Sequence, residues 1–427
     1  MGMGKRSVIA AAAVVLATSL ASIGTGSPPV VAATTQGVSA STIRIGIPYV
    51  DFAAVRAIGV NLDPGNYSDA YTALIANMNA HGGILGRHIV AYLVAVNPVA
   101  VAPSATSCTQ LTQDDQIFVS VAPLMPDCYL ADNVPTINGS GLEQKTSSPG
   151  WAPNFTLTAP SSAYDPLQLS VFSKLGAFKG KKVGLFGGDS TDKSEVAIVD
   201  AALRKLHVDV TQTAIDAAPE GDDPAAYAQA AVIAERFQSS GVNEVVAVGD
   251  GSATWPDALN ANQSSYNPPW VATNSADLNG YLEGANNPTY VKNMLTSTSI
   301  AQPLQVWATP AVQSCVRVIR RAFPADAIEA PPQIVTSKSL QVTTYAAPIT
   351  ACQNLALLAT IAEHAGRKLT ESSFTRAGEN LRNVVLPGVP SPVSFGPGRA
   401  YALGAVYVGH YDVATKTEKY ASTSSVK

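Results

Sequence analysis

Short apolar strand patterns alternate with amphipathic helix patterns along this chain, and the alternation starts afresh after Pro160. Strands that alternate with helices form mostly parallel sheets with helices packed on them. The first run has strand patterns at 43–48, 88–96, 117–122 and 134–137, and the second at 182–187, 244–249 and 270–274. Because 427 residues exceed one ordinary core, the pattern predicts an α/β protein of two Rossmann-like lobes.

Helix signals separate these strands. Ser68 is a good N-cap for a helix whose apolar face is Tyr71, Leu74, Ile75 and Met78. In the second run, helices are predicted at 167–175, at 196–206 and from Asp222. The last third differs, with helices predicted at 345–365 and 374–381 and a hairpin at 393–412 around a Gly-Pro-Gly turn.

The first residues resemble a secretory signal peptide. Lys5 and Arg6 precede an uncharged stretch at 7–23, and Val31-Ala-Ala fits a small-residue cleavage site before Thr34. We therefore expect residues 1–33 to be removed and the mature chain to be secreted or to lie in the periplasmic or cell-wall space. A retained membrane anchor is the alternative. No Cys lies near the cleavage site, so a Cys-anchored lipoprotein is not expected, and no later segment is apolar enough to span a membrane.

Composition argues against several classes of partner. The net charge is −4 and basic runs are missing, so nucleic acid is not an expected partner. No Walker loop or G-x-G-x-x-G follows a predicted strand, so we expect no nucleotide cofactor. The expected partner is a small molecule, because aromatic side chains such as those of this chain often line small-ligand sites. We also expect the chain to be a monomer.

The four cysteines allow three disulfide pairings. Two local pairs are the simplest choice, namely Cys108 with Cys128 and Cys315 with Cys352, and the first would contribute about 3 kcal/mol by closing a short loop. Buried free thiols are the alternative for the second pair. A zinc site would need closely spaced ligands such as C-x2-C, which these spacings do not supply, so no metal is expected.

Several stretches resemble one known family. These are Ile43-Arg-Ile-Gly-Ile, then Ala76-Asn-Met-Asn-Ala-His-Gly-Gly-Ile-Leu-Gly-Arg-His-Ile, Val134-Pro-Thr-Ile, Gly180-Lys-Lys-Val-Gly-Leu-Phe and Ser394-Phe-Gly-Pro-Gly-Arg-Ala-Tyr. In this order they resemble the type I periplasmic binding proteins, specifically the leucine or branched-chain amino acid-binding receptors of ABC transporters. The Gly-Gly-x-x-Gly-Arg stretch is the most specific of them. The family also carries a first-lobe disulfide where Cys108 and Cys128 stand.

The resemblance implies two lobes joined by a three-stranded hinge that close on a ligand, with an ABC permease as partner. Lobe 1 would combine 42–160 with 301–389, and lobe 2 would combine 161–300 with 390–420. The family's Ser after the strand at 119–122 is missing, and its Pro-Ser-Ala-Thr-Ser stretch is replaced by Asn138-Gly-Ser-Gly. The residues that would bind the carboxylate and ammonium groups of an amino acid therefore cannot be identified in this sequence. We do not carry over an amino acid as the ligand.

Ligands of parallel sheets bind outside the carboxyl ends of the strands. The candidate ligand-binding residues at those ends are Tyr49, Phe52, Asp127, Tyr129, Asn138, Ser140, Asp189, Ser190, Asp250, Trp255 and Asn274. The family resemblance adds Tyr345, near the hinge. For each residue the alternative is a solvated loop position, or core packing for Tyr345. We expect Asp127 and Trp255 to face each other across the cleft between the lobes.

Two other functions remain open. Gly188-Asp189-Ser190 is similar to the nucleophile block of GDSL-type esterases, which would make the chain a secreted hydrolase. However, His410 lacks an Asp three positions earlier, and no G-x-S-x-G elbow exists. We therefore do not expect an enzyme. A ligand-sensing module without transport is the second alternative, because a fold does not separate sensing from transport.

Overall fold

The computed structural model describes residues 35–57, 62–98, 101–139, 152–218, 222–275, 287–299, 303–331, 341–389, 391–403, 405–414 and 417–421. The predicted signal peptide at 1–33 and the candidate Ser140 lie outside these residues. Within the described chain, no helix combines the length and the apolar character that crossing a bilayer requires.

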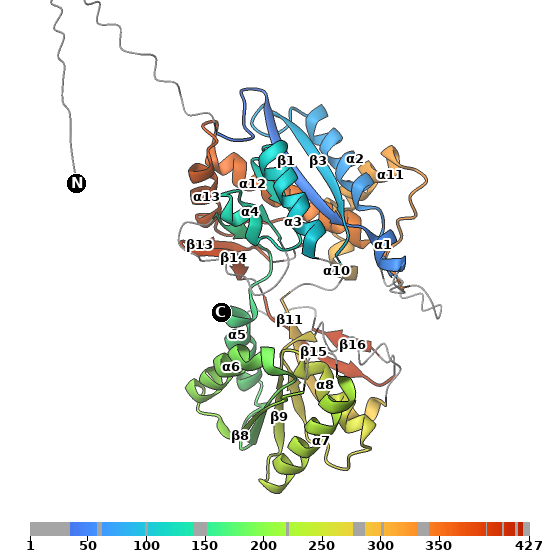
Figure 1. Ribbon diagram of the computed structural model, residues 1–427, viewed down its shortest axis with the longest axis vertical. Helices are drawn as coiled ribbons and strands as arrows, with labels where there is room; N and C mark the ends of the chain where they lie inside the picture. The colour runs from blue at the N-terminus through green and yellow to red at the C-terminus, as the bar shows by residue number, and fades with distance from the viewer. Residues whose placement is uncertain are drawn as a thin grey trace, which may run out of the picture. The chain divides into compact units, whose positions relative to one another are not determined.

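The first lobe is built on a parallel five-stranded sheet in the order β3-β1-β4-β5-β6. Figure 1 labels its neighbouring strands β1 and β3. Its strands are β1 (Thr42–Val50), β3 (His88–Val96), β4 (Val119–Val121), β5 (Thr136–Ile137) and β6 (Asn154–Phe155). A separate two-stranded parallel sheet pairs β2 (Leu62–Asp63) with β12 (Gln341–Val342). The parallel sheet expected from the alternating pattern is confirmed.

Two apolar cores form on the first sheet because β1 alternates its side chains between the faces. Ile43, Ile45 and Ile47 pack into one core with four helices, which are α2 (Tyr67–Ala80), α11 (Pro310–Ala322), α12 (Ala346–Ala365) and α13 (Glu371–Glu379). The other core involves α3 (Val101–Thr109), a π-helical turn (Gln110–Asp114) and α4 (Asp127–Ala131). Gly46 faces it, and a Cβ there would lie 2.7 Å from Ile117. Short helices α1 (Phe52–Ala57) and α10 (Pro303–Trp307) complete the lobe.

The helix α2 starts two residues earlier than its sequence suggested. Asn66 is the N-cap, and its side chain accepts a hydrogen bond from the backbone N–H of Asp69, so Ser68 is already inside the helix. The predicted apolar face is otherwise correct, since Tyr71, Leu74 and Ile75 are buried.

The second lobe has a seven-stranded sheet in the order β16-β15-β11-β10-β9-β7-β8. Its strands are β7 (Lys182–Gly187), β8 (Asp209–Ile215), β9 (Glu244–Val248), β10 (Trp270–Ala272), β11 (Met294–Thr298), β15 (Tyr407–Asp412) and β16 (Thr417–Tyr420). The first five are parallel, and β15 and β16 join antiparallel. One core contains α5 (Ser161–Lys174) and α6 (Lys193–Lys205), and the other contains α7 (Asp223–Ser239) and α8 (Gly251–Ala261).

The predicted terminal hairpin divides between the two lobes. Strands β13 (Ser394–Gly396) and β14 (Arg399–Leu403) pair with each other, and Phe395 and Ala400 pack into the first-lobe core. Thr156 also forms a bridge with Tyr401. The chain therefore joins the second sheet only at β15, after Leu403. The apolar side chains of β13 and β14 are buried in the first core, whereas β15 pairs with the edge of β11 in the second sheet.

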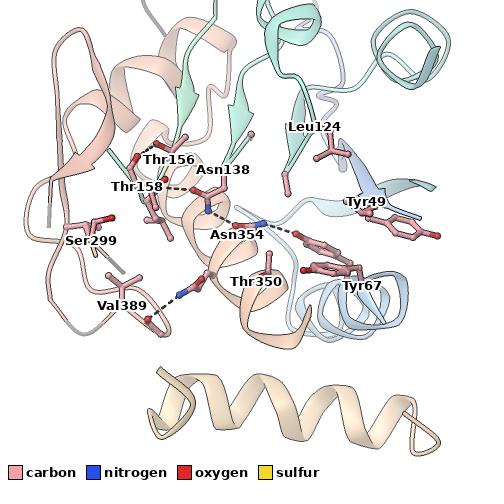
Figure 2. Close-up of a pocket in the computed structure, with 18 of the residues that line it drawn as sticks. Tyr49, Tyr67, Leu124, Asn138, Thr156, Thr158, Ser299, Thr350, Asn354 and Val389 are labelled. Carbon is pink, nitrogen blue, oxygen red and sulfur yellow. Dashed lines mark hydrogen bonds between the residues drawn. The ribbon is translucent and has the colours of Figure 1, made fainter. Parts of the chain in front are cut away.

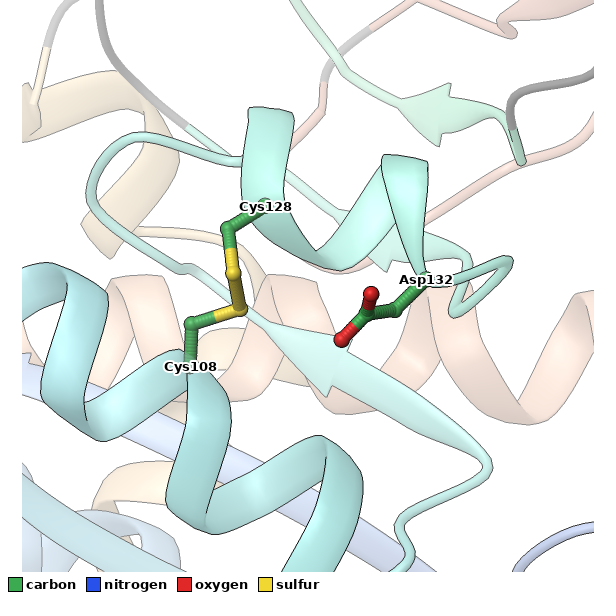
Figure 3. Close-up of side chains that lie close together, drawn as sticks. All are labelled: Cys108, Cys128 and Asp132. Carbon is green, nitrogen blue, oxygen red and sulfur yellow. A yellow bond between two sulfur atoms is a disulfide. The ribbon is translucent and has the colours of Figure 1, made fainter.

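Both predicted disulfides are confirmed. Cys108 bonds Cys128 between α3 and α4, and Cys315 bonds Cys352 between α11 and α12. Figure 3 shows Asp132 beside the first pair. The side chain of Asp132 accepts a hydrogen bond from the Thr112 hydroxyl at 2.7 Å. Because the two sulfurs are bonded to each other, this cluster is a structural crosslink and offers no thiolate to a metal.

Candidate functional site

A cavity of about 540 Å³ opens where the strands of the first sheet end (Figure 2). The ends of β1, β4, β5 and β6 form one side, α2 and α12 form another, and the segment before β13 completes it together with the chain crossings to the second lobe. Its lining residues are Pro48, Tyr49, Val50, Tyr67, Tyr71, Ala122, Leu124, Asn138, Gly139, Thr156, Leu157, Thr158, Ser299, Thr350, Gln353, Asn354, Gly388, Val389, Ser391, Val393, Ala405 and Tyr407.

A chain of hydrogen bonds runs along the floor of this cavity (Figure 2). Asn138 accepts from the backbone N–H of Leu157 at 2.7 Å and donates through Nδ2 to Asn354 Oδ1 at 2.5 Å. Asn354 in turn donates through Nδ2 to the Tyr71 hydroxyl at 2.8 Å. Asn354 is almost fully buried in an otherwise apolar stretch of α12. Since buried polar groups are costly without partners, this network fixes the orientation of three lining side chains.

Two lining residues hold a left-handed backbone conformation. Ala122, after β4, has φ of 52°, and Asn138, after β5, has φ of 48°. Asn tolerates this region, whereas Ala adopts it at a cost. Such backbone turns the chain sharply at the strand ends and aims Asn138 at α12. Backbone strain of this kind gathers at functional sites, which favours this edge as the site.

Four tyrosines, Tyr49, Tyr67, Tyr71 and Tyr407, line the cavity. The ring of Tyr67 stacks on that of Phe52, with centroids 6.0 Å apart and planes 12° apart. Burial raises the pKa of Tyr67 and of Tyr71 above the ordinary value for tyrosine, outweighing their hydrogen bonds to Thr350 and Asn354. Both phenols are therefore neutral at physiological pH and can donate their protons in hydrogen bonds.

The predicted first-lobe residues have different locations. Tyr49 and Asn138 line the cavity. Phe52 lines an adjoining cavity of about 440 Å³, which shares Tyr49 and Tyr67 with the first. Tyr345 packs against the first-lobe core, at the start of α12.

Asp127 and Tyr129 do not line either cavity. Tyr129 is 1% exposed and packs in the core that contains Cys108, so its assignment as a ligand-binding residue is wrong. Asp127 is the first residue of α4. Because it lines neither cavity, it does not face Trp255 across a ligand site as predicted. The physical reason is local: 127–131 forms a helix rather than a loop, and the crosslinked Cys128 holds that helix against α3.

The second sheet presents carboxylates at its strand ends. Asp189 follows β7, Asp250 follows β9 and Asn274 follows β10, as the sequence suggested. Asp189 accepts hydrogen bonds from the Thr191 backbone and hydroxyl, so it caps the short helical turn that Ser190 opens. Carboxylate oxygens of Asp189, Asp192 and Asp250 all lie within 4.8 Å of one another.

Asp192 is the centre of this acidic edge and was not predicted. It accepts from the backbone N–H groups of Gly188 at 2.7 Å, Asp250 at 3.3 Å and Gly251 at 3.4 Å. Burial raises its pKa to about 6, with Asp250 and Asp189 adding to the rise and the backbone donors opposing it. Gly249, at φ of 54°, would place a Cβ 2.0 Å from Asp192 Oδ1, so only glycine fits there.

Trp255 is a core residue, which corrects its predicted place in the cleft. Its side chain is 0% exposed and packs against Phe186 and Phe237, with ring centroids at 5.3 and 6.0 Å. The helix α8 begins at Gly251, directly after β9 and Asp250, so Trp255 lies in a helix. One helical turn later the side chain points back onto the sheet rather than out past the strand ends.

Several residues that line the cavity were not predicted as ligand-binding residues. Tyr71 was assigned to the buried face of its helix, which is correct, but the cavity reaches that face. Thr156 follows β6, a two-residue strand too short for periodicity to detect. Asn354 carried a usable signal, because with Gln353 it forms a pair of amides in the mostly apolar middle of α12, and buried amides need partners.

Known proteins match this chain in fold but not in sequence. No protein-family model and no curated protein matches it. Among solved structures, an ABC transporter substrate-binding protein from Desulfitobacterium hafniense in complex with Leu is 14% identical, with a TM-score of 0.59 over 89% of this chain and 100% of that one. A fatty acid ABC transporter substrate-binding protein from Thermomonospora curvata is 14% identical, with a TM-score of 0.56 over 90% and 92%.

A third solved structure is a solute-binding protein from R. palustris in complex with benzoate, 15% identical, with a TM-score of 0.55 over 89% of this chain and 95% of that one. The chain has the fold of the ABC transporter substrate-binding proteins. The predicted resemblance to type I periplasmic binding proteins is confirmed at this level. In open parallel sheets a ligand binds outside the carboxyl ends of the strands, and here that edge of the first sheet holds the cavity.

Ser190 is the residue that the esterase alternative would use as nucleophile. Asp189 is engaged with the turn that follows it, and none of the histidines in the described chain is hydrogen-bonded to Ser190. His410 lies on β15, in register with Leu295 of β11. A serine hydrolase needs a base within hydrogen-bond reach of the nucleophile, so the geometry gives the esterase alternative no support.

Proposed function

We propose that this chain is an extracytoplasmic solute-binding protein that captures a small molecule and delivers it to an ABC permease, without catalysing a reaction. The observation that carries the proposal is the cavity of about 540 Å³ at the carboxyl edge of the first sheet, on a fold shared with substrate-binding proteins. A cavity of this size with a mostly apolar wall and a few oriented polar groups is typical of small-ligand sites.

Capture would proceed by closure of two lobes about three chain crossings. Lobe 1 comprises 42–160 and 301–403, extended from the expected 389 by the hairpin of β13 and β14, and lobe 2 comprises 161–300 and 405–420. A ligand seated against α12 and then touched by the strand ends of lobe 2 would favour the closed state through its extra contacts there. Asp189, Ser190, Asp250 and Asn274 are the second-lobe residues assigned to this contact.

Export by the N-terminal segment fits the rest of the chain. The two disulfides suit an oxidising compartment outside the cytoplasm. The proposal includes removal of residues 1–33 and a monomeric mature protein, which intact-mass analysis and sedimentation of exported material would check. The neighbours in complex with Leu and with benzoate support a small ligand that has an apolar body.

A thermal-shift screen tests the proposal directly. The mature chain would be heated with amino acids, aromatic acids, amides and hydroxylated ring compounds at about 1 mM, and a ligand that binds only the native state raises the melting temperature. Small-angle scattering should then show a more compact particle with the strongest ligand. A panel in which no compound raises the melting temperature, together with unchanged scattering, would overturn the proposal.

A further inference from the structure

The cavity of the first lobe is lined without a formal charge. Its described lining contains no Asp, Glu, Lys, Arg or His, and its polar atoms belong to Tyr, Thr, Ser, Asn and Gln side chains and to the backbone. An ionised carboxylate that leaves water needs cationic partners or several converging N–H donors. Among the described lining residues, the first means, a cationic partner, is missing.

The backbone of the described strand-end turns does not supply the second means, because the N–H donors of these five residues are occupied. Ala122 N–H bonds to Ile137 O at 2.7 Å, and Asn138 N–H bonds to Phe155 O at 2.8 Å. Gly139 N–H donates to Asn154 Oδ1 at 3.0 Å. Likewise, Thr156 donates to Ala400 O and Leu157 to Asn138 Oδ1. These turns therefore form no nest of free N–H groups for an oxyanion.

The remaining donors and acceptors are neutral. Tyr71 accepts from Asn354, so its own hydroxyl proton is left for a ligand. Each amide of Asn138 and Asn354 has a second N–H that the network does not use. Hydroxyl and amide groups pair well with ligand hydroxyl, carbonyl or amide groups, and they do not neutralise an ion.

The surroundings add negative charge rather than positive. Arg56 lines the adjoining cavity, but it shares that cavity with Asp51, Asp63 and Asp326, and its guanidinium donates to Leu62 O at 3.2 Å. The strand ends of the second sheet carry Asp189, Asp192 and Asp250. These carboxylates offer a ligand carboxylate no cationic partner.

We infer that the ligand of this cavity carries no carboxylate and is an uncharged molecule with an apolar body and hydroxyl or amide groups. This inference rests on the proposed function and narrows it to a substrate class. It separates this chain from its structural neighbours in complex with Leu and with benzoate, both of which present a carboxylate. The neutral network of Asn138, Asn354 and Tyr71 is the recognition element.

Matched acid and amide pairs test the inference by titration calorimetry on the mature chain. The probes are 2-naphthoate with 2-naphthamide and nonanoate with nonanamide, which differ in charge but hardly in shape. At about pH 7.5 each amide should bind about tenfold or more tightly than its acid, because the acid must bury an unpaired charge. At about pH 5 the acids should gain affinity as their protonated fraction grows, while the amides stay constant.

A charge introduced into the wall provides the matched control. Gln353 lines the cavity and donates to Gly388 O at 3.1 Å. Gln353→Lys should shift the preference toward the acids, and Gln353→Met separates the effect of size from that of charge. An acid that binds the native chain as tightly as its amide, or an unchanged preference in Gln353→Lys, would overturn the inference and leave the proposed function standing. Failure of every acid and amide to bind would overturn the proposed function itself.

Discussion

The carboxyl edges of the two sheets have the same topology and opposite chemistry. The first edge is a cavity of neutral side chains whose polar groups are oriented by Asn138 and Asn354. The second edge is a cluster of carboxylates, in which Asp192 is buried among backbone N–H groups and Asp189 caps the following turn. Aromatic residues are divided in the same way: Tyr67 and Tyr71 line the first edge, whereas Trp255 is buried in the core of the second lobe.

The difference shows that strand-end position alone does not make a ligand site. Both edges place side chains outside a parallel sheet, as this architecture requires. What separates them is the element that follows each strand. After β5 a left-handed residue leaves the side chain of Asn138 aimed at α12, whereas after β9 the helix α8 begins at once and turns Trp255 inward.

The largest effect is expected from Trp255→Ala. Removing a fully buried ring that packs on Phe186 and Phe237 should lower the free energy of unfolding by about 3–5 kcal/mol through the cavity it leaves. Ligand affinity of the folded protein should hardly change. Denaturant unfolding and calorimetry measure both, and Tyr67→Ala is the matched variant, expected to lose affinity with a smaller loss of stability. A Trp255→Ala protein with native stability and weak ligand binding would show that Trp255 contacts the ligand and does not stabilise the core.

Loss of the Cys108–Cys128 crosslink should have the next largest effect. Replacing both cysteines with Ala removes a constraint on a sequence separation of 20 residues and should cost about 3 kcal/mol of stability, according to the chain-entropy estimate. Thermal unfolding would measure the cost. The Cys315–Cys352 pair, replaced in the same way, is the control for crosslinking in general. If the Cys108/Cys128 variant is as stable as the native chain, the crosslink does not stabilise the fold.

The acidic edge should make stability depend on pH, unlike the neutral edge. The pKa of Asp192 is raised to about 6 in the folded state, so between about pH 4 and pH 6 the folded protein binds more protons than the unfolded chain. Stability attributable to this group therefore falls as pH rises through that window, by about 1–3 kcal/mol.

Asp192→Asn should flatten that part of the pH profile of unfolding, measured with urea at each pH. Glu235→Gln, at an exposed position on α7, is the matched control and should leave the profile unchanged. The same slope in native protein and Asp192→Asn would show that this carboxylate does not carry the dependence.

The smallest effect is expected from Tyr71→Phe. The substitution removes the hydroxyl that accepts from Asn354 and keeps the ring, so affinity for a bound amide should fall by about 1 kcal/mol, the scale of one neutral hydrogen bond. Calorimetric titration with 2-naphthamide measures it, and Tyr92→Phe, outside both cavities, is the control. A gain in affinity would mean that the Tyr71 hydroxyl is not a ligand contact.

Much of the architecture was predictable from local pattern. The apolar face of α2, the N-cap at Asp222 and the strand runs at β1, β7 and β9 all appear in the structure close to their expected positions. Both disulfides followed from the simplest local pairing. These features depend on residues near one another in the chain, so periodicity and capping signals report them.

The site was only partly predictable, since it depends on contacts between distant segments. The sequence by itself determined that Asn138, Asp189 and Asp250 follow strands and that Tyr49 lies near the end of one, because strand ends can be located from periodicity. Only the tertiary structure decided that Asn138 meets Asn354 across 216 residues of chain, and that the ring of Trp255 belongs to a core. Helix phase and chain crossing set those contacts, and neither is encoded in the local pattern of apolar and polar residues.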